Sequence, residues 1–112
     1  MTGQQRLTPM TRIDVVVAGE DAGSIEELFT AADATGFTSV SNVSGLGHGG
    51  HHDGRVLFND MDALTMLFTV VPDHRADDLI DALSVLLEER PGVMFVSQTA
   101  VGRPGYFGVV EE

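Results

Sequence analysis

Glycines and histidines are concentrated in one short segment, residues 44–54, which reads SGLGHGGHHDG. Glycine leaves the backbone free to adopt positive φ angles and to approach a ligand closely. Histidine titrates near neutral pH and is a common metal ligand. The segment separates two apolar stretches by more residues than the two to five of an ordinary hairpin loop, so we expect a functional loop here.

The histidines of this loop are candidate metal ligands, namely His48, His51 and His52, with Asp53 beside them. Imidazole and carboxylate groups in such a cluster suit Zn, Ni or Cu. Their spacing matches no established metal motif, and a single solvated loop binds metal weakly. Three loops brought together in a trimer would bind more strongly, so a trimeric metal-binding protein is the alternative hypothesis for function.

The chain has 112 residues, a formal net charge of −11 and no cysteine. It contains six arginines and no lysine. Disulfides and thiolate metal sites are therefore excluded. Nucleic acids and anionic membranes require a basic surface, so we expect neither as a partner. No apolar run is long enough to cross a membrane, and residues 1–11 lack the apolar core of a secretory signal, so we expect no membrane insertion and a cytoplasmic protein.

The remaining sequence predicts two βα halves. Apolar and β-branched residues predict strands over 11–18, 37–44, 62–71 and 93–97, with 99–101 as an extension of the last. Ser24 and Glu27 form a capping box that starts a first helix, which Gly36 ends. Pro72-Asp73 starts a second helix, whose apolar stripe ends at Arg90-Pro91-Gly92.

This β-α-β-β-α-β order predicts an α+β, ferredoxin-like fold, in which an antiparallel sheet carries both helices on one face. We expect one domain over residues 11–103, with flexible tails at 1–10 and 104–112. The other sheet face would be uncovered. The alternate residues Thr65, Leu67, Thr69 and Val71 are half apolar, and an exposed face of that kind usually enters an oligomer, most simply a closed ring.

Three motifs resemble those of the PII signalling proteins. TSVSNVSGLGHGG at 38–50 resembles the family's entry to its T-loop, LFTVVPD at 67–73 its VVVPD passage, and GVMFVS at 92–97 its GKIFVS strand. Together they cover about residues 11–103 in matching order and spacing. The resemblance implies a PII-like homotrimer with a T-loop at about residues 45–59 and an adenine nucleotide in the clefts between subunits.

The resemblance also implies which residues contact ligands. Loop-base amides would bind phosphates, two strand residues would line the adenine pocket from a neighbouring subunit, and the turn before the last strand would complete the site. The nucleotide-binding residues implied in this way are Ser39, Gly45, Leu46, Gly47, Val70, Gly92 and Arg103. Arg90 is added to them from its position, because it could replace the positive charge of the lysine that this turn lacks. The implied bicarbonate-binding residues are Gly47, His48 and Arg103.

The chain departs from the PII pattern at three positions. Val93 replaces the phosphate-binding lysine of the family's GxGK turn, and with fewer cations we expect ADP or AMP in preference to ATP. The T-loop lacks the tyrosine that is uridylylated in nitrogen-sensing members. Gly49 replaces the glutamine that helps to bind 2-oxoglutarate. The chain therefore resembles the carboxysome-associated PII-like group, which is linked to bicarbonate and to ADP or AMP.

The function implied is that of a non-enzymatic sensor. Ligand binding would order or release the T-loop, which would then dock on a partner such as a bicarbonate transporter. No local motif argues for a Ser-His-Asp arrangement, and no nucleophile stands out. A small enzyme of the same fold, such as a nucleotide hydrolase, is a third hypothesis.

Overall fold

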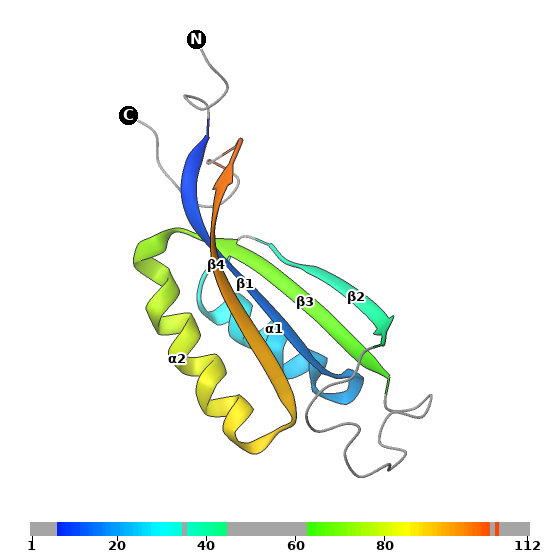
Figure 1. Cartoon of the computed structure of the whole chain (residues 1–112). Helices are drawn as coiled ribbons and strands as arrows, with labels where there is room; N and C mark the ends of the chain where they lie inside the picture. The colour runs from blue at the N-terminus through cyan, green and yellow to red at the C-terminus, as the bar shows by residue number, and fades with distance from the viewer. Residues whose placement is uncertain (1–6, 35, 45–62, 104, 106–112) are drawn as a thin grey trace.

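The computed structural model describes residues 7–34, 36–44, 63–103 and 105. Its four strands form one antiparallel sheet in the order β2-β3-β1-β4, and both helices lie on the same face of this sheet (Figure 1). The predicted α+β, ferredoxin-like βαββαβ fold is confirmed. Along the chain the elements are β1 (Thr8–Ala18), a 3₁₀ turn η2 (Gly19–Asp21), α1 (Ala22–Ala31), β2 (Thr38–Val43), β3 (Leu64–Val71), α2 (Asp73–Glu89) and β4 (Gly92–Val101).

The first strand begins earlier than the sequence predicted. β1 starts at Thr8, inside the range 1–10 that was expected to be a tail. Residues 8–10 pair with residues 99–101 of β4, and Met10 is fully buried. The pairing of β1 with β3 ends at Thr11. The start of β1 and the end of β4 therefore extend beyond the rest of the sheet as a two-stranded arm (Figure 1).

The first helix also begins before its predicted start. α1 starts at Ala22, which places Ser24 inside the first turn, and its N-cap is Asp21. The predicted capping box is therefore wrong. Asp21 makes no side-chain hydrogen bond to the helix, because its carboxylate pairs instead with Arg90. The η2 turn leads directly into the helix without a side-chain cap.

The end of α1 is formed by Asp33 and not by Gly36. Asp33 has a φ of 63°, and its N–H donates to the Thr30 carbonyl (3.0 Å). The Ala34 N–H donates to the Phe29 carbonyl (3.1 Å). These two bonds are those of a Schellman motif, in which a left-handed residue satisfies the last carbonyls of the helix. Aspartate tolerates this conformation better than most side chains, which explains the absence of glycine.

Replacing Asp33 with valine should lower the free energy of unfolding by about 1–2 kcal/mol, because a β-branched residue is strained at positive φ. Asp33→Gly is the matched control, since it also removes the carboxylate but suits the left-handed conformation. Urea unfolding of both variants would measure the difference. Equal stability of the valine and glycine variants would contradict this account of the helix end.

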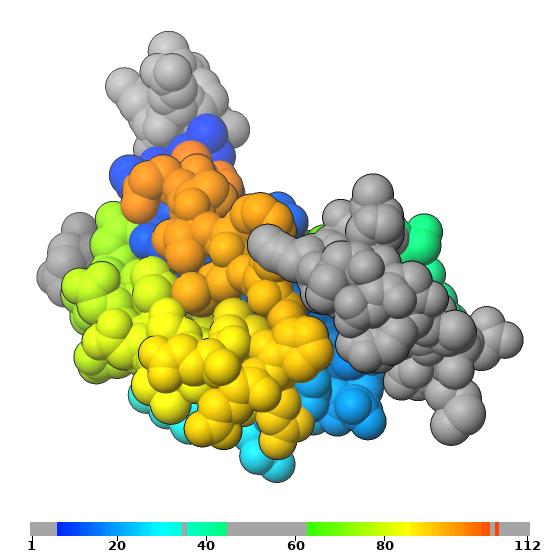
Figure 2. Space-filling view, turned by 60° about the horizontal axis from the view of Figure 1, so that its bottom comes forward, coloured from blue at the N-terminus to red at the C-terminus, as the bar shows by residue number. Residues whose placement is uncertain are grey.

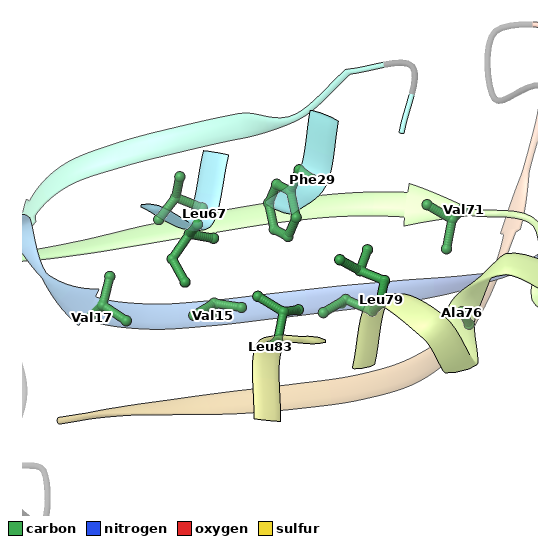
Figure 3. Close-up of a cluster of buried hydrophobic side chains, with 10 residues drawn as sticks. Val15, Val17, Phe29, Leu67, Val71, Ala76, Leu79 and Leu83 are labelled. Carbon is green, nitrogen blue, oxygen red and sulfur yellow. The ribbon is translucent and has the colours of Figure 1, made fainter. Parts of the chain in front are cut away.

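The hydrophobic core lies between the sheet and the two helices (Figure 3). Side chains from the covered face of β1 and β3 meet side chains from one stripe of each helix, and all of them are almost completely buried. Their burial supplies most of the energy that holds the helices on the sheet. The cluster consists of Ile13, Val15, Val17, Ile25, Phe29, Leu67, Val71, Ala76, Leu79 and Leu83.

The two faces of β3 are the reverse of the expected ones. Thr65, Leu67, Thr69 and Val71 are buried under the helices, whereas Leu64, Met66, Phe68 and Val70 lie on the face that the helices leave uncovered. Threonine is accepted on the covered face because its hydroxyl finds a partner there: Thr69 Oγ1 donates to the Gly36 carbonyl at 2.6 Å. On β3, therefore, the uncovered face is more apolar than the face that the helices cover.

We define the open face by residues that alternate with the buried ones and pair across the sheet. It comprises Arg12, Asp14 and Val16 of β1, Thr38 and Val40 of β2, Leu64, Met66, Phe68 and Val70 of β3, and Val93, Phe95 and Ser97 of β4.

One ion pair sits in the middle of the open face. Arg12 Nε and Nη2 donate to the two carboxylate oxygens of Asp14 at 2.8 and 2.9 Å, and this hydrogen bonding holds the pKa of Arg12 above its ordinary value. The Arg12 guanidinium carbon also lies 4.0 Å from the centre of the Phe68 ring. Both charges are matched within the chain, so the face could enter an interface without an unpaired charge.

Candidate functional site

The described residues that flank the predicted T-loop, Ser44 before it and Ala63 after it, lie at one edge of the sheet. Ala18 and Val43 both pair with Leu64, and Val17 pairs with Gly92. β1 and β2 therefore end where β3 and β4 begin. We call this region the loop-base edge and define it as Val43 and Ser44, Ala63, the η2 turn, and Arg90 to Gly92.

The strand that enters the loop is bent by a bulge at Asn42. Ser41 pairs with Thr65 and Val43 with Leu64, so Asn42 is the extra residue between two successive partners. Its φ of 60° is left-handed, a conformation in which asparagine is enriched. A bulge of this kind re-aims the strand at a functional edge. Here it sets the direction in which the chain leaves β2.

The segment that leaves the loop is attached to the end of β1. The Gly19 N–H donates to the Ala63 carbonyl at 2.8 Å. A Cβ on Gly19 would lie only 3.1 Å from that carbonyl oxygen, so any larger residue would crowd the bond. Gly19 thus connects the start of β3 to the η2 turn.

The turn before β4 requires glycine at position 92. Gly92 has a φ of +156°, and a Cβ there would lie 2.8 Å from Val17 Cγ1 and 2.9 Å from the Val16 carbonyl oxygen. The third contact, at 3.0 Å, would be with Leu87 Cδ2. The absence of a side chain lets the backbone pass close to β1 as it enters the sheet.

An ion pair between Asp21 and Arg90 connects the η2 turn to the end of α2 at the loop-base edge. Arg90 follows the last residue of α2, and its Nη1 donates to Asp21 Oδ1 of the η2 turn. The Asp21 side chain is 3% exposed, whereas the Arg90 side chain is 47% exposed. Figure 2 shows this end of the molecule, where the C-terminal part of α2 (yellow) lies beside the start of α1 (blue).

The structure brings together two of the implied nucleotide-binding residues, Arg90 and Gly92. Ser39 is the second residue of β2, opposite Leu67, and Val70 lies on the open face near the far end of β3. Arg103 lies two residues beyond the end of β4, a strand of ten residues that spans about 30 Å. A mononucleotide at Gly92 therefore cannot reach Arg103 of the same chain, and a site that uses both must include a second copy.

The loop residues implied as ligands, Gly45, Leu46, Gly47, His48, His51 and His52, lie outside the described residues. Within the part of the chain that is described, no group of three or more His, Cys, Asp or Glu side chains could hold a metal ion. No helix in the described ranges is long and apolar enough to cross a membrane.

Asp21 is the residue of this edge that sequence reasoning missed. Its partner Arg90 is 69 positions away, so no local pattern marks the pair. The available signal was an acidic residue three positions after the end of a buried strand, which is common at the start of helices and is not specific to a site.

Comparison with known proteins agrees with this geometry. The model of a family described as nitrogen regulatory protein P-II matches residues 10–106. This match covers most of the 112 residues, so the chain belongs to the P-II family. The resemblance that three motifs suggested is confirmed at the level of the family. A comparison with curated proteins gave no match.

Among solved structures, the chain is similar to CPII, a nitrogen regulatory PII-like protein from Thiomonas intermedia K12. A structure of CPII bound to ADP, AMP and bicarbonate has 32% sequence identity and a TM-score of 0.77, covering 90% of this chain and 95% of that chain. A second, bound to ADP and bicarbonate, has 31% identity and a TM-score of 0.76 with 90% and 96% covered. The apo form has 30% identity and a TM-score of 0.69 with 88% and 97% covered.

Proposed function

We propose that this chain is a non-enzymatic, cytoplasmic regulatory sensor of the PII-like type. Three copies associate through their open faces, and each cleft between subunits binds ADP or AMP with bicarbonate beside it. Residues 45–59 then contact a partner protein, such as a bicarbonate transporter of inorganic-carbon metabolism.

This assignment rests on one observation. Over 90% of its length the chain is similar, at 31–32% identity, to CPII structures whose bound ligands include ADP and bicarbonate. The chain also belongs to the P-II family, which is described as a family of regulatory proteins, and this supports a regulatory role rather than an enzymatic one. Because fold alone does not imply function, the local chemistry of the site must also fit these ligands.

The described residues fit an anionic ligand at the loop-base edge. Arg90 presents a half-exposed guanidinium next to the Gly92 turn. A guanidinium has five N–H donors and binds phosphate or carboxylate groups in a fork geometry. In this proposal, Ser39, Val70 and Arg103 reach the same ligand from a neighbouring subunit, and the loop-base residues Gly45, Leu46, Gly47 and His48 complete the contacts to phosphate and bicarbonate.

The small number of cations favours a nucleotide with few phosphates. The chain has no lysine and a net charge of −11. Each additional phosphate adds negative charge that only Arg90 and the Arg103 of a neighbouring subunit would balance in this proposal. We therefore propose ADP or AMP, and not ATP, as the principal ligand.

Isothermal titration of the purified protein with AMP, ADP and ATP, each with and without bicarbonate, tests this function. We expect ADP and AMP to bind more tightly than ATP. We also expect bicarbonate to strengthen their binding, because residues ordered by one ligand cost less entropy to order when the other binds. Sodium chloride at matched ionic strength and pH is the control for a general salt effect.

The outcomes separate the parts of the proposal. No binding of any adenine nucleotide at millimolar concentration would contradict it as a whole. Nucleotide binding that bicarbonate leaves unchanged would retain the nucleotide and reject bicarbonate as the co-ligand.

A further inference from the structure

Asp21 is a buried carboxylate that the proposed site does not yet use. It occupies the N-cap position of α1, where an aspartate usually accepts a hydrogen bond from the first turn of the helix, but it makes no such bond. Its side chain is 3% exposed and accepts from Arg90 Nη1. A carboxylate buried to this degree requires a charged partner, so Asp21 constrains where the Arg90 guanidinium lies.

Arg90 keeps most of its donors for another group. The contact with Asp21 uses Nη1, and among the described residues Arg90 has no other hydrogen-bond or ion-pair partner. Its side chain is 47% exposed, so part of the side chain that carries Nε and Nη2 is accessible at the loop-base edge. One end of the fork is thus held by the protein while the other can receive an anion.

No other described arginine can take this position. Arg12 pairs with Asp14 on the open face, and Arg75 donates to the Asp33 carbonyl at the opposite end of α2. Arg103 follows the far end of β4. Of the arginines that the structure describes, Arg90 alone lies at the loop-base edge.

We propose that Asp21 is a positioning residue for anion binding: it holds the Arg90 guanidinium so that its outward N–H groups meet a phosphate of the nucleotide. This inference rests on the proposed function. An unrestrained arginine would lose the freedom of several side-chain torsions on binding, which costs conformational entropy. Because Asp21 already restrains these torsions in the free protein, less entropy is lost when the anion binds.

Positioning and simple charge balance predict opposite effects of Asp21. If Asp21 only neutralised Arg90, removing its charge would strengthen the binding of an anion, because one nearby negative charge would be lost. If it positions Arg90, the same change weakens binding. Asp21→Asn is nearly isosteric and separates the two cases by the sign of the effect.

We therefore expect Asp21→Asn to weaken ADP binding by about 3- to 10-fold in isothermal titration. The same change in an Arg90→Gln background should have no further effect, because Asp21 acts through Arg90. Binding of adenosine, which has no phosphate, should be the same in both single variants and the wild type. Arg75→Gln is the control for the loss of an arginine, since Arg75 lies at the opposite end of α2 from Arg90.

The results that would overturn the inference are distinct from those that would overturn the function. If the wild type binds ADP and Asp21→Asn binds it as tightly or more tightly, Asp21 does not position Arg90. If Asp21→Asn weakens adenosine and ADP equally, its role is only structural. If the wild type binds no adenine nucleotide, both the function and the inference are rejected.

A measurement on the wild type covers the case in which Asp21→Asn does not fold. The Arg90 Nε–H resonance can be identified by its loss in Arg90→Lys, which retains the charge beside Asp21. We expect this resonance to shift on addition of ADP and to stay in place with adenosine. A resonance that ADP leaves unchanged would overturn the inference.

Discussion

Gly92→Ala should lower the free energy of unfolding by about 2–5 kcal/mol, the largest loss of stability that we expect from any single added methyl group. The new Cβ would lie 2.8 Å from Val17 Cγ1 and 2.9 Å from the Val16 carbonyl oxygen. The valine methyl could move slightly, but the carbonyl belongs to the central strand of the sheet and cannot. The φ of +156° adds strain that any L side chain would meet.

Such a loss is a large part of the 5–15 kcal/mol that stabilises an ordinary domain. Thermal and urea unfolding at one fixed protein concentration would measure it, since the stability of an oligomer depends on concentration. We expect a melting temperature about 10 °C or more below that of the wild type.

Gly23→Ala is the matched control, because it adds the same methyl group elsewhere. Gly23 lies in α1, and a Cβ there would have no atom within 4 Å. Alanine is favoured over glycine in a helix by up to about 1 kcal/mol, so this variant should be slightly more stable than the wild type. A Gly92→Ala protein that unfolds at the wild-type midpoint would contradict the packing described for the turn before β4.

Phe95→Asp should convert the proposed trimer to monomers. Phe95 is 59% exposed on the open face and lies directly opposite Asp14 on β1. An aspartate there would place two carboxylates across from each other and compete for Arg12. An uncompensated charge buried in an interface costs about 3–5 kcal/mol, and in a ring this cost recurs in every subunit.

Light scattering would report the change as a fall in mass from that of three 11.9 kDa chains to that of one. Val85→Asp is the control, since Val85 is 64% exposed on α2, outside the sheet and its open face. That variant should retain the wild-type mass. Trimers in both variants would show that the open face is not the interface, and a monomeric wild type would reject the trimer itself.

Much of the fold could be predicted from local patterns. The strand at 64–71 and the helix at 73–89 follow directly from the spacing of their apolar residues, and Pro72 separates them. The start of α1 could not be predicted in the same way. The Ser24 and Glu27 pattern indicated a capping box, but the helix begins three residues before Ile25, directly after the η2 turn.

The assignment of sheet faces shows a second limit. Alternation along β3 correctly separates two sets of residues, but composition pointed to the wrong set as the covered one. Thr69 is buried because the Gly36 carbonyl lies within 2.6 Å of its hydroxyl, a partner that the order of residues does not reveal. This hydrogen bond satisfies the buried hydroxyl, so threonine can occupy the covered face.

The candidate site, like the fold, was predicted only in part from the sequence. Arg90 and Gly92 were both predicted: Gly92 because the turn resembles the family's phosphate-binding turn, and Arg90 from its position beside that turn. The reason for glycine at position 92, its close passage past Val16 and Val17, is visible only in the structure. Asp21 was missed entirely, because its chemistry depends on a residue 69 positions away.

The sequence by itself determined the order of the elements, the family and the acidic, lysine-free character that limits the kind of ligand. These properties depend on composition and on interactions between residues close together in the chain. Only the tertiary structure decided which face of the sheet is open and that Asp21 holds Arg90 beside the Gly92 turn. Both depend on contacts between distant segments, which form only when the helices pack on the sheet and bring those segments together.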